Sequence, residues 1–141
     1  MSAAAALLLL AAASATARPP ELSAARRWAC FYGETISASA WAGLELAIVD
    51  PDNFAVPKST GGPLRLAYLS VGEADERRSY WEAARGKPFV VEPNPDWPGA
   101  HRVDLRAPAW RKLLLETVAP AALGKGYAGF MLDTIDVAGH L

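Results

Sequence analysis

The segment Leu64-Arg-Leu-Ala-Tyr-Leu-Ser-Val-Gly-Glu73 shows the pattern on which the fold prediction depends: an apolar run that stops at a glycine and an acid. Three other runs have the same form, at residues 28–32, 44–49 and 129–132, and each stops at a Gly or an Asp. Short apolar runs bounded in this way are typical of parallel strands that are covered on both faces. The sequence therefore predicts four such strands.

Segments with helical character separate the predicted strands. Residues 36–44 are rich in Ala and Ser, and residues 75–85 begin with acids and end with a base before a glycine, as the helix dipole favours. Pro108 suits the first turn of a helix, which we expect to end or kink near Pro120. Residues 92–99 are rich in proline and predict a long loop. This alternation of strands and helices predicts an α/β fold built from parallel β-α units.

The predicted domain corresponds to about half of an eight-stranded (β/α)8 TIM barrel. A closed barrel needs about 250 residues, whereas residues 28–141 contain four predicted strands, and the sequence stops eight residues after Asp133. We therefore expect residues 28–141 to be the N-terminal half of a barrel domain, and a fragment. Open barrel edges would favour self-association. A complete doubly wound domain is the alternative, but its fourth strand would lack a covering helix.

The N-terminal residues 1–17 carry no charge, and residues 3–13 are only Ala and Leu. They end in Ala15-Thr16-Ala17, a small-x-small pattern that a signal peptidase can cut before Arg18. The apolar run is shorter than the roughly 20 residues that a membrane-spanning helix needs. We expect a signal peptide at 1–17, a linker at 18–27, and a secreted or periplasmic protein with no stable membrane association after cleavage. An uncleaved anchor and a misassigned start are the alternatives, because no basic residue precedes the run.

The composition excludes several classes of protein. A hydrophobic fraction of 52% indicates a globular core, and the 14 basic and 15 acidic residues are scattered, which argues against a nucleic-acid partner.

The single cysteine, Cys30, cannot form an internal disulfide, and we expect it to be a buried strand residue. His101 and His140 lack the spacing of metal ligands, so we expect neither a metal nor another cofactor. Residues 76–78 are expected to form a solvated helix face.

Carboxylates follow three of the predicted strands. They come in pairs: Asp50 and Asp52, Glu73 and Asp75, Asp133 and Asp136. Because the carboxyl ends of parallel strands meet at one rim, these acids are expected to surround one site. Turn or capping roles are the alternative for Asp50, Asp75 and Asp136. Asp133 directly ends an apolar run, where a charge must be solvated, paired or used.

Several segments, taken in order, resemble glycoside hydrolase family 114, the barrel enzymes described as endo-α-1,4-polygalactosaminidases. The two most specific are Tyr68-Leu-Ser-Val-Gly-Glu-Ala74 and Gly129-Phe-Met-Leu-Asp-Thr-Ile-Asp136, and the likeness also includes Arg78-Ser-Tyr-Trp81, Asn94-Pro-Asp-Trp-Pro-Gly99 and Val103-Asp-Leu105. The resemblance implies hydrolysis of an α-1,4-linked, galactosamine-rich polysaccharide. It also implies that Asp133 is one catalytic acid and that the second, a Glu on a later strand, has no counterpart here.

The expected site joins the resemblance to the chemistry of sugar binding. Glycosidases use two carboxyl groups, about 5–5.5 Å apart in retaining enzymes and about 6.5–9.5 Å apart in inverting ones. With only one of them present, we expect the chain alone to be inactive. An acidic rim suits cationic amines, and aromatic rings cover sugar faces. Besides Asp133 as the catalytic residue, the candidate substrate-binding residues are Tyr32, Asp50, Tyr68, Glu73, Trp97 and Asp136. A non-catalytic carbohydrate-binding module is the alternative function.

Overall fold

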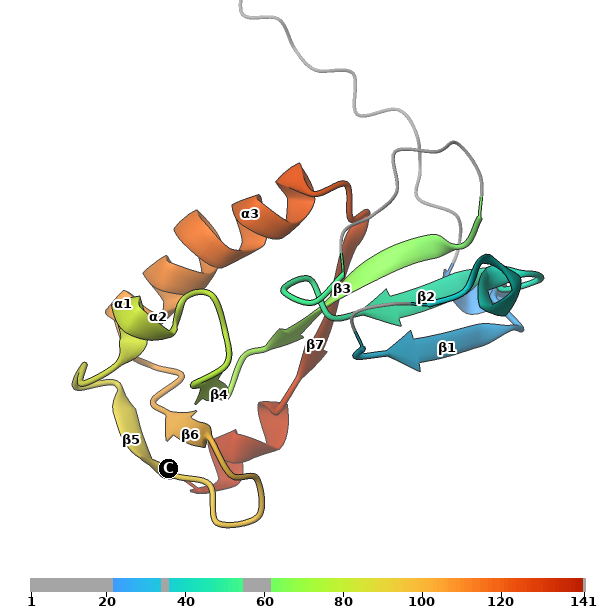
Figure 1. The fold of residues 1–141 in the computed structure, drawn as a ribbon. Helices are drawn as coiled ribbons and strands as arrows, with labels where there is room; N and C mark the ends of the chain where they lie inside the picture. The colour runs from blue at the N-terminus through green and yellow to red at the C-terminus, as the bar shows by residue number, and fades with distance from the viewer. Residues whose placement is uncertain (1–21, 34–35, 55–61, 141) are drawn as a thin grey trace, which may run out of the picture.

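A computed structural model describes residues 22–33, 36–54 and 62–140 of the chain. Its main element is a four-stranded parallel sheet (Figure 1). The strands lie side by side in chain order: β1 (Trp28–Phe31), β2 (Leu46–Val49), β3 (Leu64–Ser70) and β7 (Gly129–Asp133). This arrangement confirms the predicted α/β fold with sequential parallel strands.

The two faces of the sheet have different surroundings, because side chains alternate along each strand. One face carries Ala47, Val49 and Ala67, which are buried in a cluster with Phe54 and Tyr127. The register aligns the residues of the opposite face across the sheet, in rows such as Cys30, Ile48, Leu66 and Gly129. This second face corresponds to the interior of a barrel.

Cys30 lies on this second face and is exposed, so the expectation that it is buried is wrong. Its neighbour on the same face of β1, Trp28, is also 59% exposed. The physical reason is that β1 is an edge strand and no described segment covers its barrel-facing side. An apolar run alone does not reveal whether a strand lies at the edge or in the centre of a sheet.

One continuous helical stretch directly precedes β7 in the chain (Figure 1). It consists of α2 (Pro108–Leu113), a π-helical turn at Leu114–Val118 and α3 (Ala119–Gly124). Pro108 stands at its start, as predicted. The helix does not end at Pro120, however. A proline has no N–H and its ring crowds the carbonyl four residues earlier, and the wider π turn directly before Ala119 accommodates both effects.

A second, antiparallel sheet was not predicted from the sequence. Its strands are β4 (Glu73–Asp75), β6 (Ala100–Val103) and β5 (Val90–Pro93), in the order β4-β6-β5. The predicted loop at residues 92–99 is in fact the end of β5 and the hairpin connection to β6. The remaining elements are short: α1 (Trp81–Ala84) and 3₁₀ segments at Leu22–Ala24, Ala38–Trp41 and Ile135–His140.

The helix predicted at residues 75–85 is therefore only partly correct. Asp75 ends β4, and its carboxylate accepts the backbone N–H of Arg77, which turns the chain before a helix can begin. Only α1 is helical, and Gly86 follows it with φ +70°, the left-handed conformation that favours glycine. The helix predicted at residues 36–44 is a single turn capped by Ser37.

Trp110 joins the long helix to the sheets. Its side chain is 0% exposed and packs against Tyr80 and Phe89, with ring centroids 5.8 and 5.5 Å away. Its indole Nε1 donates to the carbonyl of Val71 at 2.7 Å, at the point where β3 leads into β4. This contact holds the strand end that carries the candidate acids.

Within the described residues, no helix is long and apolar enough to cross a membrane. The predicted signal peptide at 1–17 and the first part of the predicted linker lie outside the described residues.

Replacing Trp110 by Phe should lower the free energy of unfolding by about 2 kcal/mol. The carbonyl of Val71 loses its donor, and the smaller ring leaves a void in the core. Urea denaturation measures the difference. Trp28→Phe, at a 59% exposed position, is the matched control and should change stability by less than about 0.5 kcal/mol. Equal losses in the two variants would contradict this role of Trp110.

Candidate active site

The carboxyl ends of the parallel strands lie around one cleft of about 900 Å³. Asp50 directly follows β2, Glu73 begins β4 after a two-residue connection from β3, and Asp133 is the last residue of β7. The structure brings all seven predicted site residues to this cleft: Tyr32, Asp50, Tyr68, Glu73, Trp97, Asp133 and Asp136. Their roles in binding and catalysis stay predictions.

Tyr68 and Asp133 form a direct hydrogen bond. The Tyr68 hydroxyl donates to Oδ2 of Asp133 at 2.8 Å, and the Tyr68 ring packs edge-on against Tyr32 at 5.2 Å. Burial, together with this bond and the negative charge of Asp133, raises the pKa of Tyr68 above its ordinary value. The phenol therefore stays protonated around neutral pH and remains a donor. Asp133 has one oxygen held by Tyr68, and among the described residues no side chain donates a hydrogen bond to the other.

Glu73 is only 7% exposed and is held from two sides. Its Oε1 accepts a hydrogen bond from the Asn94 side chain at 2.6 Å, and its backbone carbonyl accepts one from Ser70 at 3.0 Å. The first bond ties the acid to the hairpin between β5 and β6. The antiparallel sheet thus contributes to the cleft that the parallel sheet begins.

Asp50 is engaged by the protein itself. Oδ1 lies 2.5 Å from Nη1 of Arg78 and accepts the backbone N–H of Asp52, and Oδ2 accepts a bond from Asn53. The Arg78 guanidinium also lies over the Tyr68 ring, 5.3 Å from its centre. Asp50 is therefore the partner of a buried ion pair, and both of its oxygens accept bonds from neighbouring protein groups.

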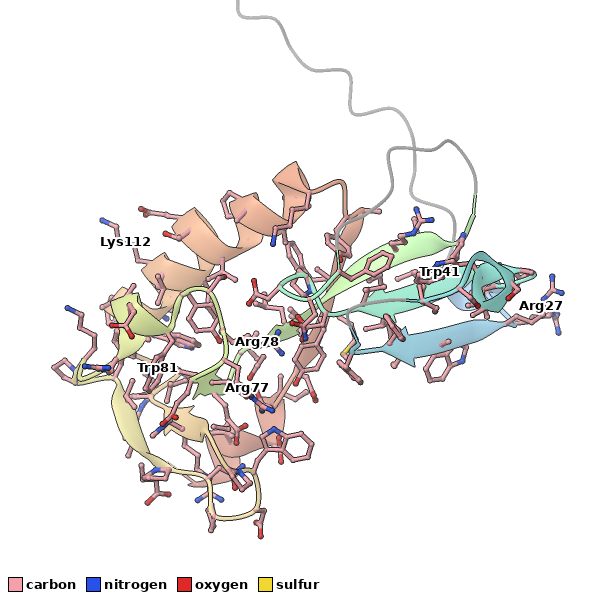
Figure 2. All side chains as sticks on the ribbon, viewed as in Figure 1. Arg27, Trp41, Arg77, Arg78, Trp81 and Lys112 are labelled. Atoms are coloured by element: carbon pink, nitrogen blue, oxygen red, sulfur yellow. The ribbon has the colours of Figure 1, made fainter. Side chains whose placement is uncertain are left out.

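Arg78 was missed as a site residue. Its segment was expected to be a solvated helix face, yet its side chain is only 16% exposed and lines the cleft. Figure 2 shows Arg77 and Arg78 between the ribbons of the two sheets. The one available sequence signal was the segment Arg78-Ser-Tyr-Trp81, which is part of the family resemblance but does not say what the arginine contacts.

Asp75 has the turn role that the sequence left open, because its carboxylate accepts the backbone N–H of Arg77. It pairs with Arg77, whose Nη2 lies 2.6 Å from Oδ2. Burial acts to raise the pKa of Asp75, but the hydrogen bonds and charge of Arg77 prevail and hold it below its ordinary value. Asp52 accepts two bonds from Ser79. Three of the cleft carboxylates are thus occupied by neighbouring protein groups.

Four cleft carboxylates have no basic side chain within salt-bridge distance among the described residues: Glu73, Asp96, Asp133 and Asp136. Acids gathered in a cleft create a negative potential that attracts cations. Two rings stand exposed in the same cleft, Tyr32 at 48% and Trp97 at 60%. The arrangement combines negative charge with flat apolar surfaces. Over the same described residues, no group of three or more His, Cys, Asp or Glu side chains is placed to hold a metal ion.

Arg78→Met should lower the free energy of unfolding by about 3 kcal/mol, because it leaves the Asp50 carboxylate buried without its cation. Adding Asp50→Asn should recover most of that loss, since the double variant has no unpaired charge. Urea denaturation of the single and double variants measures this coupling. Arg106→Met is the control, because Arg106 pairs with Asp104 on the exposed surface. A double variant no more stable than Arg78→Met would contradict the pairing.

Comparison with known proteins covers most of the chain. The sequence pattern of glycoside-hydrolase family GH114 matches residues 8–138. An uncharacterized protein of Deinococcus radiodurans is 33% identical over 135 residues, which cover 85% of this chain and 44% of that protein. The chain thus spans less than half the length of this relative.

Two solved structures share the fold. The crystal structure of Aspergillus fumigatus Ega3 in complex with galactosamine aligns with a TM-score of 0.66 at 20% identity, over 78% of this chain and 44% of that one. The glycoside hydrolase domain of PelA from Pseudomonas aeruginosa aligns with a TM-score of 0.59 at 28% identity, over 79% and 46%. The four-stranded sheet therefore corresponds to part of a TIM barrel, and the chain belongs to glycoside-hydrolase family GH114.

Proposed function

We propose that this chain forms one side of the substrate cleft of an exported glycoside hydrolase that cuts an α-1,4-linked, galactosamine-rich polysaccharide. The observation that carries the proposal is the Tyr68–Asp133 pair, which stands at the end of a barrel strand and faces an open acidic cleft. In barrel enzymes, catalytic groups come from this end of the strands.

Asp133 is the proposed catalytic carboxylate. Tyr68 holds one of its oxygens at 2.8 Å, so the carboxyl group has a defined orientation while the other oxygen can reach a substrate. Arg78 and Tyr32 pack against the Tyr68 ring and restrict its motion. A rigidly supported carboxylate is what an attack on, or a proton transfer to, a glycosidic bond requires.

The reaction needs a second carboxyl group across the cleft. The family resemblance implies a Glu on a later strand, and the sheet described here contains four strands. We propose that the second acid comes from the part of the barrel that these strands do not form. Glu73 is buried and held by Asn94, which suits a role in supporting the cleft and binding substrate.

The proposed substrate follows from the surface of the cleft. Glu73, Asp96, Asp133 and Asp136 offer negative charge without a paired base in the described structure, and Tyr32 and Trp97 offer exposed rings. A polymer of galactosamine has protonated amines and flat sugar faces that match both. Each exposed ion pair would contribute about 1 kcal/mol or less. The similarity to Ega3, which was crystallized with galactosamine, supports this substrate class.

A non-catalytic carbohydrate-binding module is the second candidate. The same exposed rings and free carboxylates favour it, because they would bind a sugar chain without a second acid. The two candidates differ in turnover once the rest of a barrel is present. Open strand edges would in either case favour self-association of the isolated chain.

The isolated chain should bind galactosamine oligomers but release no reducing ends, because one carboxylate cannot serve as both catalytic groups. Fusing the remaining strands of a GH114 barrel after Leu141 should give turnover, and Asp133→Asn should abolish it. Asp104→Asn, outside the cleft, is the charge-matched control and should retain turnover. Turnover by the isolated chain that Asp133→Asn leaves unchanged would refute the role of Asp133. Binding without turnover in the fusion would favour the binding module.

The proposed export of the protein leads to a separate prediction. N-terminal sequencing of protein recovered outside the cytoplasm should begin at Arg18, because Ala15-Thr16-Ala17 offers the cleavage site. Replacing Ala17 by Arg should block cleavage and retain the uncut precursor. Protein outside the cytoplasm that still begins at its original N-terminus would contradict a cleaved signal peptide.

A further inference from the structure

The residue after Asp133 has an unusual backbone. Thr134 has φ 60°, and no other non-glycine residue in the described ranges has a positive φ. This left-handed conformation is costly for a β-branched side chain, whose branch crowds the backbone. Such conformations persist only where surrounding contacts enforce them, and they are concentrated at functional sites.

The contacts that enforce it come from the end of β3. The Thr134 hydroxyl accepts the backbone N–H of Gly72 at 2.8 Å and lies 2.8 Å from the Ser70 hydroxyl and 2.7 Å from the carbonyl of Asp133. The Ser70 hydroxyl in turn lies 3.0 Å from the carbonyl of Glu73.

Two hydroxyl hydrogens serve these contacts. Ser70 donates its hydrogen to the carbonyl of Glu73, so the single hydrogen of the Thr134 hydroxyl goes either to Ser70 or to the carbonyl of Asp133. In either arrangement the Thr134 oxygen accepts the backbone N–H of Gly72, so Thr134 bridges the ends of β3 and β7.

Steric contact adds to the hydrogen bonds. A Cβ on Gly72 would lie 2.0 Å from the carbonyl oxygen of Thr134 and 2.9 Å from Cβ of Val137, which is itself buried. Backbone atoms cannot yield at such a distance, so only glycine allows the two strand ends to approach so closely. The approach is therefore fixed by both the Thr134 hydroxyl and the absence of a side chain at Gly72.

We infer that Thr134 is a positioning residue that fixes the carboxylate of Asp133 relative to Tyr68 and Glu73. Asp133 directly precedes Thr134, and Glu73 directly follows Gly72, so the bridge lies one residue from each acid. The inference rests on the proposed role of Asp133 for its catalytic consequence, whereas the bridge itself is a statement about geometry. Tyr68 reports on that geometry through its bond to Asp133.

The test compares three substitutions in the chain. Thr134→Ser keeps the hydroxyl, Thr134→Val keeps the shape without it, and Thr134→Gly relieves the backbone strain while removing the bridge. The readout is the 13Cζ NMR signal of Tyr68 in tyrosine-labelled protein, assigned by its loss in Tyr68→Phe. The signal in Asp133→Asn marks a Tyr68 without its carboxylate partner.

The expected result separates positioning from stability. Thr134→Ser should leave the Tyr68 signal at its original position, and Thr134→Gly should shift it toward the Asp133→Asn position even though glycine tolerates the backbone. Thr134→Val should shift it in the same direction. Ser39→Ala, which removes a surface hydroxyl bonded to Ser37, is the control and should shift nothing. An unshifted Tyr68 signal in folded Thr134→Gly would overturn the inference.

Activity provides a second arm that distinguishes the two proposals. In the fusion with a complete barrel, Thr134→Gly should lower kcat by on the order of a hundredfold with little change in KM, as small misplacements of reacting groups do. Thr134→Ser, which keeps the hydroxyl, should retain the kcat of the parent. An active parent whose kcat survives Thr134→Gly would overturn the positioning role. A shifted Tyr68 signal in a fusion with no hydrolysis would refute the proposed function and leave the geometric inference standing.

Discussion

The pairing of β3 with β7 is the constraint on which the site depends. Its register places Tyr68 opposite Met131 and Ser70 opposite Asp133. A shift of one residue would turn every side chain of the shifted strand to the other face of the sheet. Asp133 would then leave the cleft and Tyr68 would lose its acceptor. Gly72 and Thr134 follow the last paired residues of the two strands, and their hydrogen bond and close approach hold the strand ends together.

The cleft is built by two sheets of different kinds. The parallel sheet supplies Tyr68 and Asp133, whereas the antiparallel sheet and its hairpin supply Glu73 and Asn94. The burial of Trp110 between the long helix and the end of β3 fixes how these parts meet. The substrate cleft is therefore the joint product of a barrel-type core and an excursion that follows its third strand.

Charge in the cleft is divided between structural and free groups. Asp50 and Asp75 are occupied by Arg78 and Arg77, and these pairs organise the walls. The carboxylates without a basic partner in the described structure line the same cleft and give it a negative potential. Of the three buried acids, Asp50 and Asp75 are paired with arginines and Glu73 is held by Asn94, which offsets the cost of burying them.

The sequence by itself determined the four parallel strands, the helix that begins at Pro108 and the family, because short apolar runs and their terminal acids are local patterns. It also identified six of the seven acids that line the cleft, since strand ends in parallel sheets share one rim, but it missed Asp96, which lies in the hairpin between β5 and β6. Only the tertiary structure decided which acids are paired. Asp50 and Arg78 are 28 residues apart, and Tyr68 and Asp133 are 65 apart. Likewise, the exposure of Cys30, the antiparallel sheet and the strained Thr134 follow from how distant segments pack, and no local pattern encodes such contacts.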